Sequence, residues 1–267
     1  MKRMISVIFS LLLLLSSCGG TEKTLWADSC DYSRPLELKA AEIDREQIEK
    51  WADTEFEEYV CYVSISDGKL IISKSAETKE SHIMAGNNGY FIGVDLGEFD
   101  GFIEYRSYHS AWSEDWTPPV TAMSETVIPE NCRGFVKADN TYGYALTGYS
   151  HMFTDEGAIY KLTFPTANSY YTCTKICELS ACPRAYTYDG ESEAVYIATT
   201  NELLLLSLKD DTVKVLADIS VFSPLGTTSM VYTDGKIYIG MCMGIYEYDT
   251  KTNDSAWYPL DIEKYAK

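Results

Sequence analysis

The pattern of apolar and polar residues changes near Tyr59, and from there to the C-terminus it predicts short β-strands. The strands are rich in Tyr, Val, Ile and Thr, and turns that contain Gly, Asp or Asn separate them. The clearest hairpin joins residues 59–66 to residues 69–73 through the Asp67-Gly68 pair. Asp-Gly favours the tight two-residue turns that suit the twist of paired strands. The body of the chain is therefore expected to be all-β.

These strands recur in sets of four. One set comprises residues 134–138, 142–149, 158–162 and 171–175, a second comprises 184–188, 194–197, 203–206 and 213–216, and a third comprises 229–233, 236–239, 244–248 and 255–258. Residues 89–94 and 102–106 form part of a fourth set. The Tyr-Ile pair at Tyr196 returns at Tyr238, 42 residues later. Four strands in every ~40 to 50 residues are typical of propeller blades, which bury their apolar faces against one another.

The segment from Tyr246 to Asn253 resembles the strand and Asp-x-x-Thr turn of bacterial propeller repeats. This resemblance implies a small β-propeller-like domain of four or five blades. A β-sandwich or an irregular β-domain is the alternative, because no tryptophan repeats at a fixed position.

A single helix is predicted before the strands, over residues 41–58. Asp44 and Gln47 have the spacing of a capping box. Ile48, Trp51 and Phe56 follow at near-helical spacing with charged residues on the other faces, so the apolar stripe is expected to pack on the body.

The N-terminus has the pattern of a secretory signal. A basic start at Lys2-Arg3 precedes an apolar run that is too short to span a bilayer. Leu15-Ser16-Ser17-Cys18 resembles the bacterial lipobox, which implies that Cys18 is lipidated and becomes the new N-terminus. We therefore expect a signal peptide over 1–17, a lipidated and irregular tether over 18–37, and a single domain over 38–267.

The charge of the chain limits its partners. The 267 residues contain 22 Lys+Arg and 40 Asp+Glu, and the signal contains two of the cations and no acid, so the mature chain has 20 cations against 40 acids and a net charge of −20. This balance argues against nucleic acid and against adsorption to anionic lipid headgroups. The expected partners are the membrane, through the lipid anchor, and an unknown protein, peptide or glycan ligand.

Seven cysteines remain after Cys18, in an exported chain where disulfides can persist. Cys173, Cys177 and Cys182 form the densest group, and we expect a disulfide among them. Their spacing does not supply the four paired ligands of a zinc site, so no metal and no cofactor are predicted.

One long segment interrupts the rhythm of the strands between Tyr105 and Cys132. Long loops in compact domains are usually functional or disordered. The aromatic side chains of this segment, with a histidine and acids beside them, are expected to form a stacking surface for a sugar, a peptide or another ligand with an apolar face. The candidate ligand-binding residues are Tyr108, His109, Trp112, Asp115 and Trp116. A loop folded over the body with local core tryptophans is the alternative.

No catalytic motif is present. The chain lacks Gly-x-Ser-x-Gly, a phosphate-binding Gly-x-x-x-x-Gly-Lys and His-Glu-x-x-His. Its 40 acids leave carboxylate pairs for sugar chemistry open. We expect a lipid-anchored, extracytoplasmic binding or scaffold module in the cell envelope, at the outer membrane if the host has one. A surface enzyme on glycans or peptides and an acidic immunity or inhibitor lipoprotein are the alternatives.

Overall fold

The computed structural model describes residues 23–29, 36–52, 60–74, 81–97, 99–108, 125–167 and 169–261. Strands dominate this part of the chain, and their burial follows the sequence pattern. Strand β6 (Gly89–Leu96) alternates between buried and half-buried side chains, as one face packs and the other is less covered. Strand β14 (Ala194–Thr199) is buried at every position because both of its faces are covered. The Asp67-Gly68 turn has positive φ at both residues, as its sequence predicts.

The strands form five four-stranded sheets. The first contains β1 (Thr24–Ser29), β2 (Leu36–Lys39), β3 (Tyr62–Ser66) and β4 (Lys69–Ser73), and the second contains β5 (Ser81–Ala85), β6, β7 (Phe99–Ser107) and β8 (Glu125–Ile128). The third contains β9 (Cys132–Lys137), β10 (Tyr142–His151), β11 (Thr154–Thr163) and β12 (Thr172–Leu179). The fourth contains β13 (Pro183–Asp189), β14, β15 (Glu202–Ser207) and β16 (Thr212–Asp218), and the fifth contains β17 (Thr227–Thr233), β18 (Lys236–Met241), β19 (Gly244–Asp249) and β20 (Ser255–Pro259).

The sets of four strands predicted from the sequence are confirmed in the third, fourth and fifth sheets. In each, consecutive strands pair antiparallel in chain order. The partial fourth set is completed by β5 and β8, which flank β6 and β7.

The first sheet departs from the prediction. The chain expected to be irregular between residues 19 and 37 contains β1 and the start of β2. Strand β1 pairs antiparallel with β2 and parallel with β4, so the strand order is β2-β1-β4-β3. The alternation of buried Leu36 and Leu38 extends over only four residues, which is too short to distinguish a strand from a loop by pattern alone.

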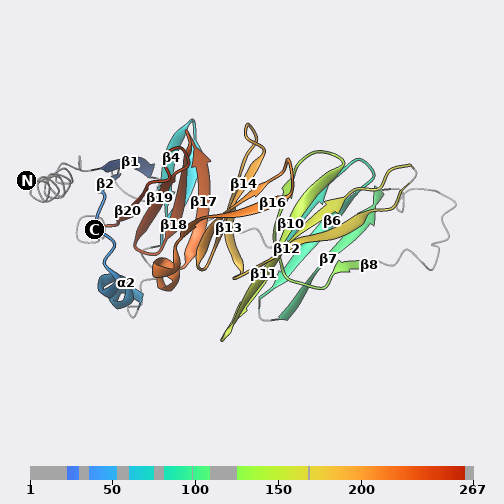
Figure 1. The fold of residues 1–267 in the computed structure, drawn as a ribbon, viewed down its shortest axis with the longest axis horizontal. Helices are drawn as coiled ribbons and strands as arrows, with labels where there is room; N and C mark the ends of the chain where they lie inside the picture. Colours follow the sequence, from blue (N-terminus) through green and yellow to red (C-terminus); the bar gives the residue numbers. More distant parts are fainter. Residues whose placement is uncertain are drawn as a thin grey trace, which may run out of the picture.

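Buried apolar side chains of the described residues form four clusters, one at each junction between neighbouring sheets. The clusters join the second sheet to the third, the third to the fourth, the fourth to the fifth and the fifth to the first. The sheets therefore form a row, with the first sheet at one end and the second at the other (Figure 1). The expected all-β architecture of repeated sheets is confirmed, while the five described sheets do not close into the ring of a propeller. Strand periodicity specifies the sheets but not the angle between them.

The helix is shorter at its start than predicted. Helix α2 covers Arg45–Ala52, and residues 53–59 lie outside the described part of the chain. The side chain of Asp44 accepts a hydrogen bond from the backbone of Gln47 (3.2 Å), which caps the helix and explains why it starts at Arg45. Ile48 and Trp51 pack on the body beside the 3-10 helix η3 (Ser220–Leu225), as expected of the apolar stripe.

Candidate functional site

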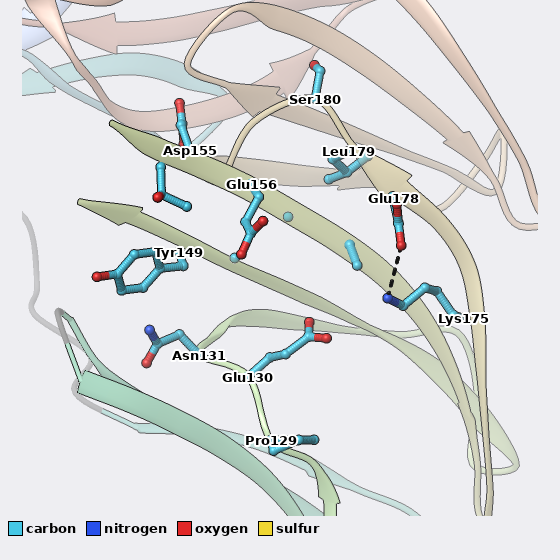
Figure 2. Close-up of a pocket in the computed structure, with 14 residues that line it drawn as sticks. Pro129, Glu130, Asn131, Tyr149, Asp155, Glu156, Lys175, Glu178, Leu179 and Ser180 are labelled. Atoms are coloured by element: carbon cyan, nitrogen blue, oxygen red, sulfur yellow. Dashed lines mark ion pairs between the residues drawn. The ribbon is translucent and has the colours of Figure 1, made fainter. Parts of the chain in front are cut away.

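A cavity lies at one end of the third sheet, beside its junction with the second. It measures about 650 Å³. Its walls come from the connection between β8 and β9, from the β10–β11 hairpin and from the end of β12 (Figure 2). The lining residues used below are Glu130, Asn131, Gly148, Tyr149, Thr154, Asp155, Glu156, Ala158, Lys175 and Glu178. We call this cavity the acidic pocket.

Glu130 occupies a defined position in the pocket because two hydroxyl groups hold its carboxylate. Thr147 donates to one oxygen (2.6 Å) and Tyr160 donates to the other (2.6 Å). Thr147 and Tyr160 project from the face of the third sheet that packs on the second sheet. Burial, followed by the hydrogen bond to Glu130, raises the pKa of Tyr160 to about 12, so this hydroxyl stays protonated and remains a donor.

Lys175 is the cation of the pocket. Its ammonium lies 5.3 Å from the centre of the Tyr160 ring and 3.5 Å from a carboxylate oxygen of Glu178. Contact with the Tyr160 hydroxyl, and then the charges of Glu130 and Glu178, raise the pKa of Lys175. Strand register explains this grouping, because β11 places Tyr160 opposite Lys175 and Ala158 opposite Glu178.

The β10–β11 hairpin supplies the remaining polar groups. Tyr149 pairs with Glu156 across the two strands. A carboxylate oxygen of Asp155 accepts a hydrogen bond from the backbone of Cys182 (2.9 Å), which ties the hairpin to the connection before β13. Four carboxylates and one ammonium line the pocket, a formal charge of −3, so its electrostatics favour a cationic ligand group.

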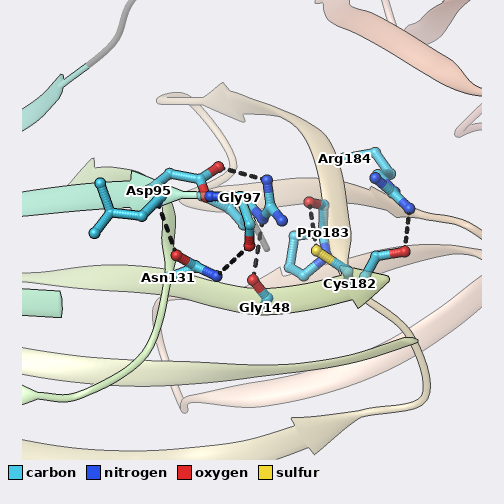
Figure 3. A network of polar contacts seen from close by, with 10 residues as sticks. Asp95, Gly97, Asn131, Gly148, Cys182, Pro183 and Arg184 are labelled. Atoms are coloured by element: carbon cyan, nitrogen blue, oxygen red, sulfur yellow. Dashed lines mark hydrogen bonds and ion pairs between the residues drawn. The ribbon is translucent and has the colours of Figure 1, made fainter. Parts of the chain in front are cut away.

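A network of polar contacts forms the rim beside the pocket (Figure 3). The Asn131 side chain accepts from the backbone of Leu96 and donates to the carbonyl of Gly97, both at 3.0 Å. Arg133 forms an ion pair with Asp95 (2.5 Å) and donates to the carbonyl of Gly148 (3.1 Å). The rim therefore joins the β6–β7 turn of the second sheet to the third sheet and holds the two walls together.

Of the residues singled out from the sequence for ligand binding, Tyr108 alone lies in the described part of the chain. It follows β7, is exposed, and its ring centre is 5.7 Å from that of Tyr90. Its backbone donates to Asn88 in the β5–β6 turn. This turn lies at the end of the second sheet opposite the β6–β7 turn and the acidic pocket. His109, Trp112, Asp115 and Trp116 lie outside the described residues.

The disulfide expected among Cys173, Cys177 and Cys182 is not formed, and all three thiols are free. Cys173 and Cys177 are four residues apart on β12, a strand length of about 13 Å, whereas a disulfide needs Cα atoms within about 7 Å. The thiol of Cys182 instead donates to the carbonyl of Pro183 (3.5 Å). Cys18, the expected lipidation site, lies outside the described residues.

Sequence reasoning did not select the residues of the acidic pocket. Glu130, Glu156 and Glu178 are separated by more than 20 residues each and share no motif. Strand register alone brings them to one end of the sheet.

No group of three or more His, Cys, Asp or Glu side chains within the described ranges is arranged to hold a metal ion. No helix in that part of the chain has both the length and the apolar character that a membrane span requires.

Comparison with known protein families finds no match, and comparison with curated proteins finds none either. Among solved structures, the chain is similar to the WD40 β-propeller domain of Doa1 (12% identity, TM-score 0.33, 45% of this chain and 38% of that chain). It is also similar to a GH74 enzyme from Niastella koreensis (13%, 0.42, 64% and 28%) and to apo AztD from Citrobacter koseri (10%, 0.37, 67% and 46%). The chain spans less than half the length of each, and similarity at this level carries no argument about function.

Proposed function

We propose that the protein is a lipid-anchored, extracytoplasmic binding module whose ligand occupies the acidic pocket. The lipobox-like Leu15-Ser16-Ser17-Cys18 sequence supports the anchor. The observation that carries the binding role is the fixed carboxylate of Glu130, which Thr147 and Tyr160 hold in a cavity large enough for a small ligand.

The chemistry of the pocket favours a ligand with an amino or guanidino group. A carboxylate that two hydroxyls orient has further lone pairs with which to accept charge-assisted hydrogen bonds. Tyr149 adds an aromatic surface on which the apolar part of a ligand can pack. A lysine or arginine side chain of a peptide and an amino sugar both fit this description.

The anchor is tested by metabolic labelling with a palmitate analogue. The wild-type protein is expected to incorporate the label and to sediment with membranes, and Cys18→Ala is expected to lose both properties. Sedimentation of Cys18→Ala with membranes at the wild-type level would contradict lipid anchoring.

The pocket is tested by calorimetric titration with Nα-acetyl-lysine amide. Glu130→Gln is expected to weaken binding at least tenfold, because it replaces a carboxylate by an amide of the same shape. Glu191→Gln, which makes the same change of charge in the exposed β13–β14 turn, is the matched control. If binding is lost in Trp112→Ala/Trp116→Ala but kept in Glu130→Gln, the ligand binds the segment between Tyr105 and Cys132 and not the acidic pocket.

One observation favours a second candidate function, a surface enzyme on glycans. Glycoside hydrolysis needs two carboxyl groups on either side of the scissile bond, and Glu130, Glu156 and Glu178 line one cavity. Nitrophenyl glycosides test this candidate directly. Hydrolysis by the wild-type protein that both Glu130→Gln and Glu156→Gln abolish would establish the enzyme.

A further inference from the structure

The turn between β10 and β11 exposes two large apolar side chains. Met152 is 85% exposed and Phe153 is 104% exposed. The two strands pair over ten residues each, and the hairpin projects from the row of sheets (Figure 1). An aromatic ring at the tip of such a hairpin gains nothing from the body of the protein.

Met152 is also an unusual residue for its backbone conformation. Its φ is 53°, in the left-handed region that Gly, Asn and Asp tolerate best. Among the other non-glycine residues with positive φ in the described chain, only Met243 is apolar, and it is fully buried. The rest are polar, namely Asp67, Glu193, Asp211, Asp234 and Asn253. The β10–β11 turn therefore combines steric strain with exposed apolar surface, and a contact outside this chain would offset both.

The hairpin that carries this turn also forms a wall of the acidic pocket. Tyr149 lies just before the turn, and Thr154, Asp155 and Glu156 follow it. The base of the turn is held in place, because Arg184 of the fourth sheet donates to the Ser150 hydroxyl (2.5 Å). The apolar tip and two of the pocket carboxylates, Asp155 and Glu156, thus lie on one hairpin whose base contacts the fourth sheet.

We propose that Met152 and Phe153 dock into an apolar socket of a partner protein that places a lysine or arginine side chain in the acidic pocket. The inference rests on the proposed function, since both use the same pocket. Charge complementarity identifies the partner: the pocket has a formal charge of −3 and the mature chain one of −20. The same charges disfavour insertion of the tip into an anionic membrane.

The test begins with selection from a phage-displayed library of random 12-residue peptides on the immobilised wild-type protein. We expect enrichment of peptides with Lys or Arg next to apolar residues. A synthetic copy of the most enriched peptide is then titrated by fluorescence polarisation. Met152→Ser/Phe153→Ser is expected to weaken binding at least ~30-fold, the effect of removing a central aromatic anchor. Tyr170→Ser, which alters another exposed aromatic, is the control and should leave binding unchanged.

Other outcomes overturn the inference. The selection could enrich no peptide, or only peptides without basic residues. The tip variant, Met152→Ser/Phe153→Ser, could bind the peptide with the wild-type affinity. Phe153-dependent binding to phosphatidylcholine vesicles would make the tip a membrane contact. Titration of the tip variant with Nα-acetyl-lysine amide separates the two proposals. If Met152→Ser/Phe153→Ser still binds this probe and also binds the peptide as tightly as the wild type does, the proposed function stands. The tip then has no docking role.

Discussion

The hydroxyl of Tyr160 donates a 2.6 Å hydrogen bond to the carboxylate of Glu130, and this contact joins β11 to the connection between β8 and β9. Tyr160 is 8% exposed and belongs to the apolar cluster between the second and third sheets. The core of the junction therefore positions the carboxylate of the pocket.

Tyr160→Phe is expected to lower the free energy of unfolding by about 1 to 2 kcal/mol, because one carboxylate oxygen loses its donor in a partly buried place. Urea denaturation measures this change. Tyr170→Phe removes a hydroxyl from a residue that is 90% exposed and should have no effect. Equal stability of Tyr160→Phe and the wild type would show that the contact adds nothing to the junction.

Asp211 connects the third and fourth sheets. It accepts hydrogen bonds from Lys161 (2.8 and 3.0 Å) and from Tyr144 (2.5 Å). Burial acts to raise the pKa of Asp211, but these hydrogen bonds outweigh burial and keep the pKa below its ordinary value. The carboxylate is therefore charged at neutral pH.

Asp211→Asn is expected to lower the free energy of unfolding by about 1 kcal/mol through loss of the ion pair, and the loss should shrink in 1 M NaCl. Asp211→Ala should lose about 1 kcal/mol more, because φ at this position is 58° and Asn tolerates that conformation better than Ala. Urea denaturation at two salt concentrations measures both effects. A salt-independent loss in Asp211→Asn would contradict the ion-pair explanation.

Stability is expected to fall as pH rises above 9. Burial raises the pKa of the Cys61 thiol and of the Cys132 thiol from 9.0 to about 12. Between these values the unfolded chain releases protons that the folded chain keeps, so rising pH favours unfolding, while below pH 9 these thiols add no pH dependence.

Urea denaturation at pH 8, 9, 10 and 11 measures this slope. Cys132→Ala should show a shallower decline than the wild type because one of the groups is gone. The same free energy of unfolding at pH 8 and pH 11 would show that the thiols ionise equally in both states.

Alkylation should divide the described cysteines into two groups. Cys173, Cys177 and Cys242 are half-buried, whereas Cys61, Cys132 and Cys182 are buried. Iodoacetamide under native conditions is expected to modify the first group, and the second should react only after denaturation. Peptide mass spectrometry with and without prior reduction provides the readout. Modification of Cys173 or Cys177 only after reduction would reveal a disulfide.

The sequence predicted the repeated sheets better than the site. Strands such as β14 and β18 carry dense β-forming runs next to clear turns, and local pairing of consecutive strands follows from them. Strand β1 was missed because its parallel pairing with β4 joins residues more than 40 positions apart. The acidic pocket was missed for a similar reason, since Glu130 and Glu178 meet only through the register of β10, β11 and β12.

The row of sheets has a consequence for the pocket, because a linear stack loosens from its ends and each sheet depends on its neighbour. The second sheet stands at one end of the row (Figure 1). The lining of the pocket includes the connection that joins this sheet to the third. A ligand that fills the pocket would contact both this connection and the third sheet, and would therefore stabilise the junction between the two sheets. Occupancy would then slow amide exchange in β6 and β7, whose own residues do not line the pocket.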